Sequence, residues 1–69
     1  MKGKIVILNG KDKYFVMNEL KTKEHEYYQI MKIDGDEDFV LVEKIGDEFF
    51  QIVDASLAKR ILYEMFKNM

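Results

Sequence analysis

Apolar residues along the chain gather in five short runs separated by polar residues, and they cover residues 4–8, 14–20, 26–33, 39–45 and 49–53. Pairs that favour tight turns lie in three of the gaps: Asn9-Gly10, Asp34-Gly35 and Gly46-Asp47. Links this short favour antiparallel pairing, because parallel neighbours need a crossover of about a dozen residues. The pattern therefore predicts five strands in an antiparallel meander.

The last part of the chain changes period. From Asp54 onward the apolar residues recur every three or four positions, which predicts an amphipathic helix that packs through Leu57, Ile61, Leu62, Met65 and Phe66. Asp54 is the expected N-cap, because its carboxylate can accept the free amide hydrogens of the first turn. We therefore predict an α+β fold, a single domain over residues 1–69 with a five-stranded antiparallel meander and one C-terminal helix packed across it.

The width of the sheet sets a packing problem. Alternation in the second run puts Phe15 and Met17 on one face and Tyr14, Val16 and Asn18 on the other, so both faces carry apolar residues. One helix about 10 Å across covers about half of one face of a sheet roughly 19 Å wide. Either the sheet coils strongly into a partly closed barrel around the helix, or its second face meets another molecule, for instance in a homodimer. Strong coiling is the preferred prediction.

Composition narrows the class of protein. The chain has 69 residues, 48% of them apolar, and no cysteine, so a core is expected without disulfides or thiolate metal sites. The longest apolar run is four residues, which predicts no membrane span and a cytoplasmic protein. The net charge is −2, yet residues 34–54 carry eight acids against Lys44 alone.

The acidic middle third suggests a surface for a protein partner. Carboxylates on hairpin tips can occupy a basic groove on another protein. We predict a small, non-enzymatic protein-binding or regulatory module, with an inhibitor as one form, whose partner surface combines these acids with exposed tyrosines: Tyr27, Tyr28, Asp36, Glu37, Asp38, Asp47 and Glu48. The alternative is a nucleic-acid-binding module that uses Lys11, Lys13, Lys21 and Lys23, although nucleic acid is the weaker prediction because no RNP-type pattern is present.

Other residues give weaker signals for chemistry. His25 stands between Glu24 and Glu26, but no nucleophile neighbours it, so we expect a solvated histidine and no enzymatic activity. The acids of residues 34–38 resemble the start of a calcium loop, but Phe39 and Ile45 stand where that loop needs Gly and Glu. We expect no metal site and no cofactor.

The layout of the runs resembles a known family. A Tyr-Phe-Val-Met strand, a strand with a Tyr-Tyr pair, an acid-rich turn, a Phe-Val-Leu-Val strand and a Phe-Phe-Gln-Ile-Val strand lead into a helix that starts at an Asp. This order, over residues 4–67, is similar to the YrzB-like family of small uncharacterised bacterial proteins, and it is compatible with phage-borne relatives. The chain departs from the family in Ala55, Ser56, Ala58 and Lys59, where members tend to carry acids. The resemblance implies a β-rich domain and assigns no site.

Overall fold

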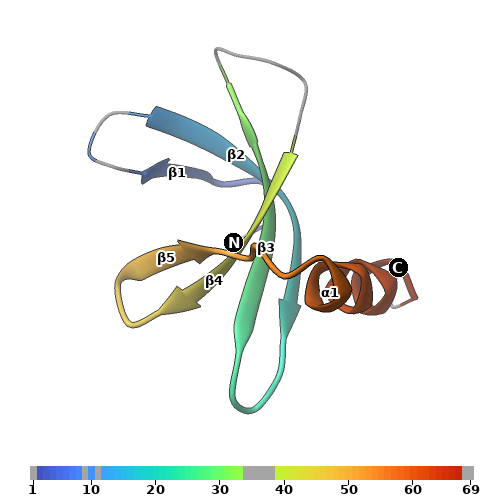
Figure 1. Ribbon diagram of the computed structural model, residues 1–69. Helices are drawn as coiled ribbons and strands as arrows, with labels where there is room; N and C mark the ends of the chain where they lie inside the picture. The colour runs from blue at the N-terminus through green and yellow to red at the C-terminus, as the bar shows by residue number, and fades with distance from the viewer. Residues whose placement is uncertain (1, 9, 11, 34–38, 68–69) are drawn as a thin grey trace.

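The computed structural model describes residues 2–8, 10, 12–33 and 39–67. Within these residues it contains five strands and a helix: β1 (Ile5–Leu8), β2 (Asp12–Lys21), β3 (Glu26–Lys32), β4 (Phe39–Ile45), β5 (Glu48–Gln51) and α1 (Ala55–Lys67). The strands form one antiparallel sheet in the order β1-β2-β3-β4-β5, and α1 follows β5 (Figure 1). The predicted α+β meander with a C-terminal helix is confirmed.

The sheet is strongly curled. Val6 and Leu8 from one edge and Phe49 from the other pack against the same buried cluster, which we call the inner core: Val16, Tyr28, Ile30 and Val42. The two edges of a flat sheet about 19 Å wide could not share one cluster. In Figure 1, β1 and β5 accordingly lie on the same side of the central strands. The predicted coiling is confirmed, and the sheet covers its second face with its own edges.

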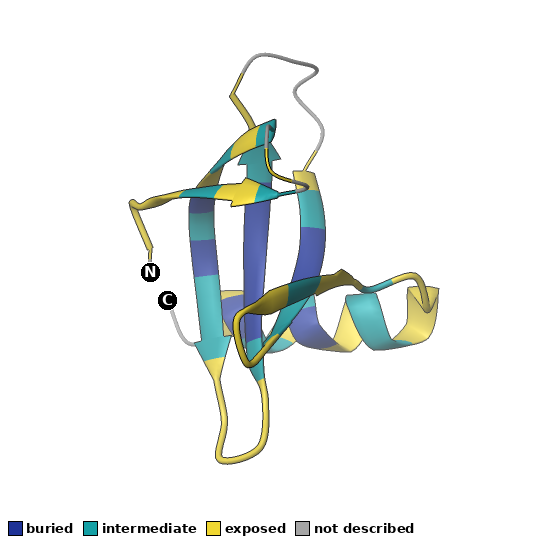
Figure 2. Ribbon diagram, turned by 90° about the vertical axis from the view of Figure 1, so that its left-hand side faces the viewer, coloured by how far each residue is buried: buried dark blue, intermediate teal, exposed yellow. Residues whose placement is uncertain are grey.

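The helix lies outside this curl. It packs on the opposite face of β3 and β4 through a second cluster, the outer core: Tyr27, Leu41, Ile61 and Met65. Figure 2 shows the buried residues gathered in the central strands and in α1. The prediction of a barrel formed around the helix was therefore wrong. Ile52, just after β5, packs against the outer core, so the chain enters α1 on the outer side of the sheet.

A β-bulge changes the faces of β2. Val16 pairs with Ile30 and Asn18 with Gln29, so Met17 is an extra residue in the ladder. Because Ile30 and Gln29 are consecutive in β3, Val16 and Asn18 point to opposite faces. The prediction that Tyr14, Val16 and Asn18 share a face holds for the first two and was wrong for Asn18. A bulge bends its strand and increases the local twist, which helps the sheet to curl.

The helix begins as predicted. Asp54 Oδ1 accepts the backbone N–H of Ser56 at 2.9 Å and that of Leu57 at 3.3 Å.

Ile61 and Met65 are buried against the sheet, and Leu57 and Leu62 pack beside them. Phe66 is 55% exposed, so its predicted place in the packed face was wrong. Phe66 follows Ala58 and Leu62 in a row that is only half-buried, and it lies beyond the outer core. Over the described residues, no helix is long and apolar enough to cross a bilayer.

Candidate functional site

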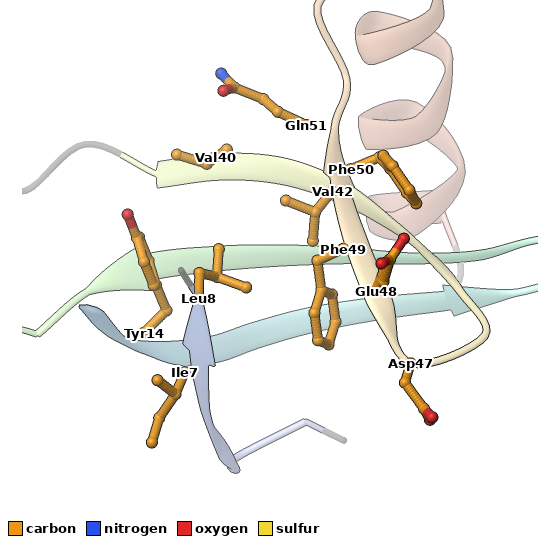
Figure 3. A pocket seen from close by; sticks show the side chains of 10 residues that line it. All are labelled: Ile7, Leu8, Tyr14, Val40, Val42, Asp47, Glu48, Phe49, Phe50 and Gln51. Atoms are coloured by element: carbon orange, nitrogen blue, oxygen red, sulfur yellow. The ribbon is translucent and has the colours of Figure 1, made fainter. Parts of the chain in front are cut away.

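The curled sheet leaves a hollow between its two edge strands. Each of β1 and β5 has one neighbour in the sheet, so the half-barrel stays open between them. A cavity of about 630 Å³ lies there (Figure 3), within the usual size range of ligand pockets. We call this cavity the seam hollow. Its lining comes from four strands and one turn: Ile7, Leu8, Tyr14, Val40, Val42, Asp47, Glu48, Phe49, Phe50 and Gln51.

The floor of the seam hollow is apolar and belongs to the inner core. Leu8, Tyr14, Val40 and Phe49 line it and also pack against the buried cluster around Val42. The Phe49 ring meets the Tyr28 ring edge-on, with centroids 6.2 Å apart. Edge-to-face rings at this separation are a favourable arrangement, so Phe49 is held in place before any partner arrives. The hollow therefore offers a preformed apolar surface.

One rim of the seam hollow is acidic. Gly46, with φ +63°, allows the tight turn between β4 and β5, and Asp47 and Glu48 follow it at the mouth of the hollow. Both acids are exposed. No basic residue stands among the lining residues, so the rim attracts positive charge. The structure thus places two of the predicted partner-binding acids, Asp47 and Glu48, beside an apolar surface that the sequence analysis did not identify.

The edges that flank the hollow carry unpaired backbone groups. In an antiparallel strand alternate residues direct their N–H and C=O groups to one side, so an edge strand leaves half of them without a neighbouring strand. All residues of β5, Glu48–Gln51, line the seam hollow. The β5 edge can therefore accept a further strand from the side of the hollow.

The predicted exposure of Tyr27 and Tyr28 was wrong. Tyr27 is 8% exposed and Tyr28 1%, because each ring belongs to a core. Burial raises the pKa of both phenols, and the charges of Glu43 at Tyr27 and of Glu26 at Tyr28 add to the rise. The Tyr28 hydroxyl donates a hydrogen bond to Glu26 Oε2 at 3.3 Å. Neither ring is available to a partner in this state.

The remaining predicted acids, Asp36, Glu37 and Asp38, lie outside the described residues.

Tyr14 and Phe49 line the hollow but were not predicted from the sequence as members of a candidate site. The signal was present, because Tyr14 shares its face with Val16 and Phe49 begins an apolar run. The missing information was the curl, which brings these two strands to one hollow.

His25 is exposed, as predicted, but it has a specific partner. Its Nδ1 lies 2.6 Å from Glu43 Oε2, and its ring stacks on Tyr27 with centroids 5.4 Å apart. The acid comes from β4 and is neither of the neighbours Glu24 and Glu26. Thr22 Oγ1 accepts the backbone N–H of His25 and of Glu24. The Thr22 hydroxyl therefore stabilises the turn. The His25–Glu43 pair lies beside the outer core, because the His25 ring stacks on Tyr27.

The lysines of the alternative hypothesis are spread along the sheet. Lys13 and Lys21 stand near opposite ends of β2, roughly 26 Å apart at the usual rise per residue. Lys21 Nζ lies 3.9 Å from Glu19 Oε2, and Lys11 lies outside the described residues. Lys13 and Lys21 therefore do not belong to one patch, and nucleic-acid binding stays a prediction.

Among the described residues, no group of three or more His, Asp or Glu side chains could hold a metal ion. Comparisons with protein-family models, with curated proteins and with solved structures find no match to this chain. The resemblance to the YrzB-like family remains a prediction.

Proposed function

We propose that the protein is a protein-binding module that holds an extended segment of its partner in the seam hollow. The segment pairs with the free edge of β5, places its apolar side chains on Leu8, Tyr14 and Phe49, and carries Lys or Arg toward Asp47 and Glu48. The observation that carries this proposal is a hollow with apolar side chains in its floor, flanked by a free strand edge and an acidic rim.

Each feature of the hollow selects one property of the partner. Strand addition requires an extended backbone with free N–H groups, which excludes proline at the pairing positions. Side chains alternate along such a segment, so every second residue meets the apolar floor. The acidic rim favours basic residues and disfavours acids, by an interaction that salt weakens.

In this proposal Asp47 and Glu48 keep their predicted role in partner binding, but the hollow that receives the other molecule lies on this protein and not on the partner. From the sequence we expected acidic tips to enter a basic groove on the partner. Here the tip formed by Asp47 and Glu48 borders a hollow of its own, and the partner brings the basic side chains to it. Whether binding inhibits the partner depends on which segment of that partner is held.

A fluorescent octapeptide of alternating lysine and valine tests the proposal by fluorescence anisotropy. We expect a dissociation constant on the order of 100 µM, since little surface is buried and the free peptide must be ordered. A glutamate–valine octapeptide should bind at least about tenfold more weakly, because the rim repels it. A lysine–valine peptide with one central proline should also lose affinity, because proline cannot donate to the ladder.

Matched charge variants locate the binding. Glu48→Lys should weaken the lysine–valine peptide several-fold, and Asp47→Lys with Glu48→Lys by about tenfold. Glu24→Lys makes the same charge change at an exposed turn residue that does not line the seam hollow, and it should leave the affinity within about twofold. Equal loss in Glu24→Lys and Glu48→Lys, or equal affinity for the two peptide charges, would contradict the proposal.

A further inference from the structure

The outer face of the sheet carries a second apolar surface, which meets the seam hollow at Ile7. Its members are between 39% and 59% exposed, and we call it the outer strip: Ile5, Ile7, Phe15, Ile33 and Phe39. Strand register aligns Ile5 with Phe15, Phe15 with Met31 and Met31 with Phe39. Residues directly opposite in neighbouring strands point to the same face, so these four side chains form one continuous row across β1 to β4.

A second row extends the strip. Ile7 lies opposite Lys13 in the register of β1 and β2, and the backbone N–H of Ile33 donates to the Lys13 carbonyl oxygen at 3.1 Å. Among the residues that the structure describes, Lys13 is thus the charged residue that the register places between strip members, and it stands in this second row. The first row, from Ile5 to Phe39, contains no charge.

The outer strip occupies the part of the helix-bearing face that α1 leaves open. Phe39 and Leu41 are two residues apart in β4 and so share a face, yet Leu41 is buried beneath α1 and Phe39 is 47% exposed. In β3 the contrast is smaller: Tyr27 is buried under the helix, and Met31, four residues further on, is half-buried. Figure 1 shows α1 beside one end of the sheet only. A helix of 13 residues is too small to shelter the whole face.

A pair of buried polar residues separates the outer strip from the region that α1 covers. Asn18 and Gln29 pair across β2 and β3 between the strip and the helix contact, and both are buried. No buried side-chain nitrogen or oxygen of the described residues lacks a hydrogen-bond partner. The outer strip is therefore separate from the helix contact, and the buried polar side chains that border it have hydrogen-bond partners. A partner can cover the strip without moving α1.

We infer that the outer strip is the interface of a symmetric homodimer. The five exposed side chains present roughly 500 Å², if each large side chain offers about 200 Å² when fully open. That is about a tenth of the 5224 Å² surface, the share that specific interfaces take of a small protein. Two strips would bury about 1,000 Å² in total, the lower limit for a specific interface.

A second copy suits the strip better than a charged partner. A twofold interface sets the same patch against itself, so it needs a surface without a row of like charges, and the first row meets this condition. The chain also lacks disulfides, and domains of this size are commonly stabilised by a partner copy. The homodimer considered from the sequence used the second face of the sheet. That face is the inside of the curl, so the inferred dimer uses the helix-bearing face.

Sedimentation equilibrium from about 1 to 500 µM tests the inference. The wild-type chain should pass from 8.2 kDa to twice that mass, with a dissociation constant on the order of 10–100 µM for so small an interface. Phe39→Glu and Ile5→Glu, at the two ends of the first row, should each weaken dimerisation at least about tenfold. Phe66→Glu changes an aromatic residue of similar exposure outside the strip and should leave the dimer unchanged. Circular dichroism confirms that each variant is folded.

Two results would overturn the inference. A wild-type chain that stays at 8.2 kDa up to 500 µM would show that the outer strip is not a homodimer interface. A dimer that survives both Phe39→Glu and Ile5→Glu, in folded protein, lies elsewhere on the surface. Because Ile5 and Phe39, which the test variants change, do not line the seam hollow, this test is independent of peptide binding.

Discussion

Tyr27 and Tyr28 are consecutive residues of β3, and their rings are buried in two different cores. Tyr27 packs with Leu41, Ile61 and Met65 under the helix, whereas Tyr28 packs with Val16, Ile30 and Val42 inside the curl. Alternation along a strand sends neighbours to opposite faces, so this pair shows that β3 is covered on both sides. The covers differ in kind, since a helix closes one side and the edges of the sheet close the other.

The outer core depends on α1, and one charge should destroy it. Ile61→Asp places a carboxylate at a position that is 3% exposed and packed among the apolar side chains of the outer core. The cost is several kcal/mol, comparable with the whole stability of so small a domain. We expect a chain unfolded at 25 °C by circular dichroism. Tyr63→Asp, on the exposed side of the same helix, should remain folded. A cooperative melt for Ile61→Asp near that of the wild type would contradict the assigned packing.

The N-cap of α1 makes a smaller contribution. Asp54→Ala removes the acceptor for the N–H groups of Ser56 and Leu57 and should cost about 1 kcal/mol in urea unfolding. Asp54→Asn retains an oxygen acceptor and should recover most of that loss. If the alanine and asparagine variants are equally stable, the carboxylate does not act as a cap.

Stability should fall at alkaline pH. Burial, followed by the nearby charge of Glu26, raises the pKa of Tyr28 above its ordinary value of 10. The unfolded chain therefore loses the phenolic proton first, so this contribution to stability is complete below pH 10 and is lost as pH rises toward the folded-state pKa. Urea midpoints measured from pH 8 to 11.5 should decline, and Tyr28→Phe should reduce the slope. An unchanged slope in Tyr28→Phe would contradict a buried, titrating Tyr28.

The order of elements could be predicted from the sequence because it depends on local signals. Turn pairs and the change of period after Asp54 mark the element limits, and β4 matches its predicted bounds, residues 39–45, at both ends. The bulge at Met17 could not be predicted, since nothing local distinguishes it from a regular strand residue. The same applies to the side on which α1 packs, which follows from the path through Ile52.

The candidate site was only partly predictable for the same reason. The position of Asp47 and Glu48 on a hairpin tip follows from Gly46 and the flanking apolar runs. Their closeness to Leu8 and Tyr14 depends on the curl, which joins residues about 35 positions apart in the chain. Exposure of Tyr27 and Tyr28 was mispredicted because the alternation alone does not show that both faces of β3 are covered.

Amide chemical shifts and hydrogen exchange in ¹⁵N-labelled protein, with and without the lysine–valine octapeptide, test the proposed binding most directly. We predict shift changes at β5 and at Leu8 and Tyr14, and slower exchange for outward-facing N–H groups of Glu48–Gln51 as they gain partners in the added strand. The glutamate–valine octapeptide should produce neither effect. Shift changes confined to α1 or to the outer strip, or no protection in β5 at saturating peptide, would contradict it.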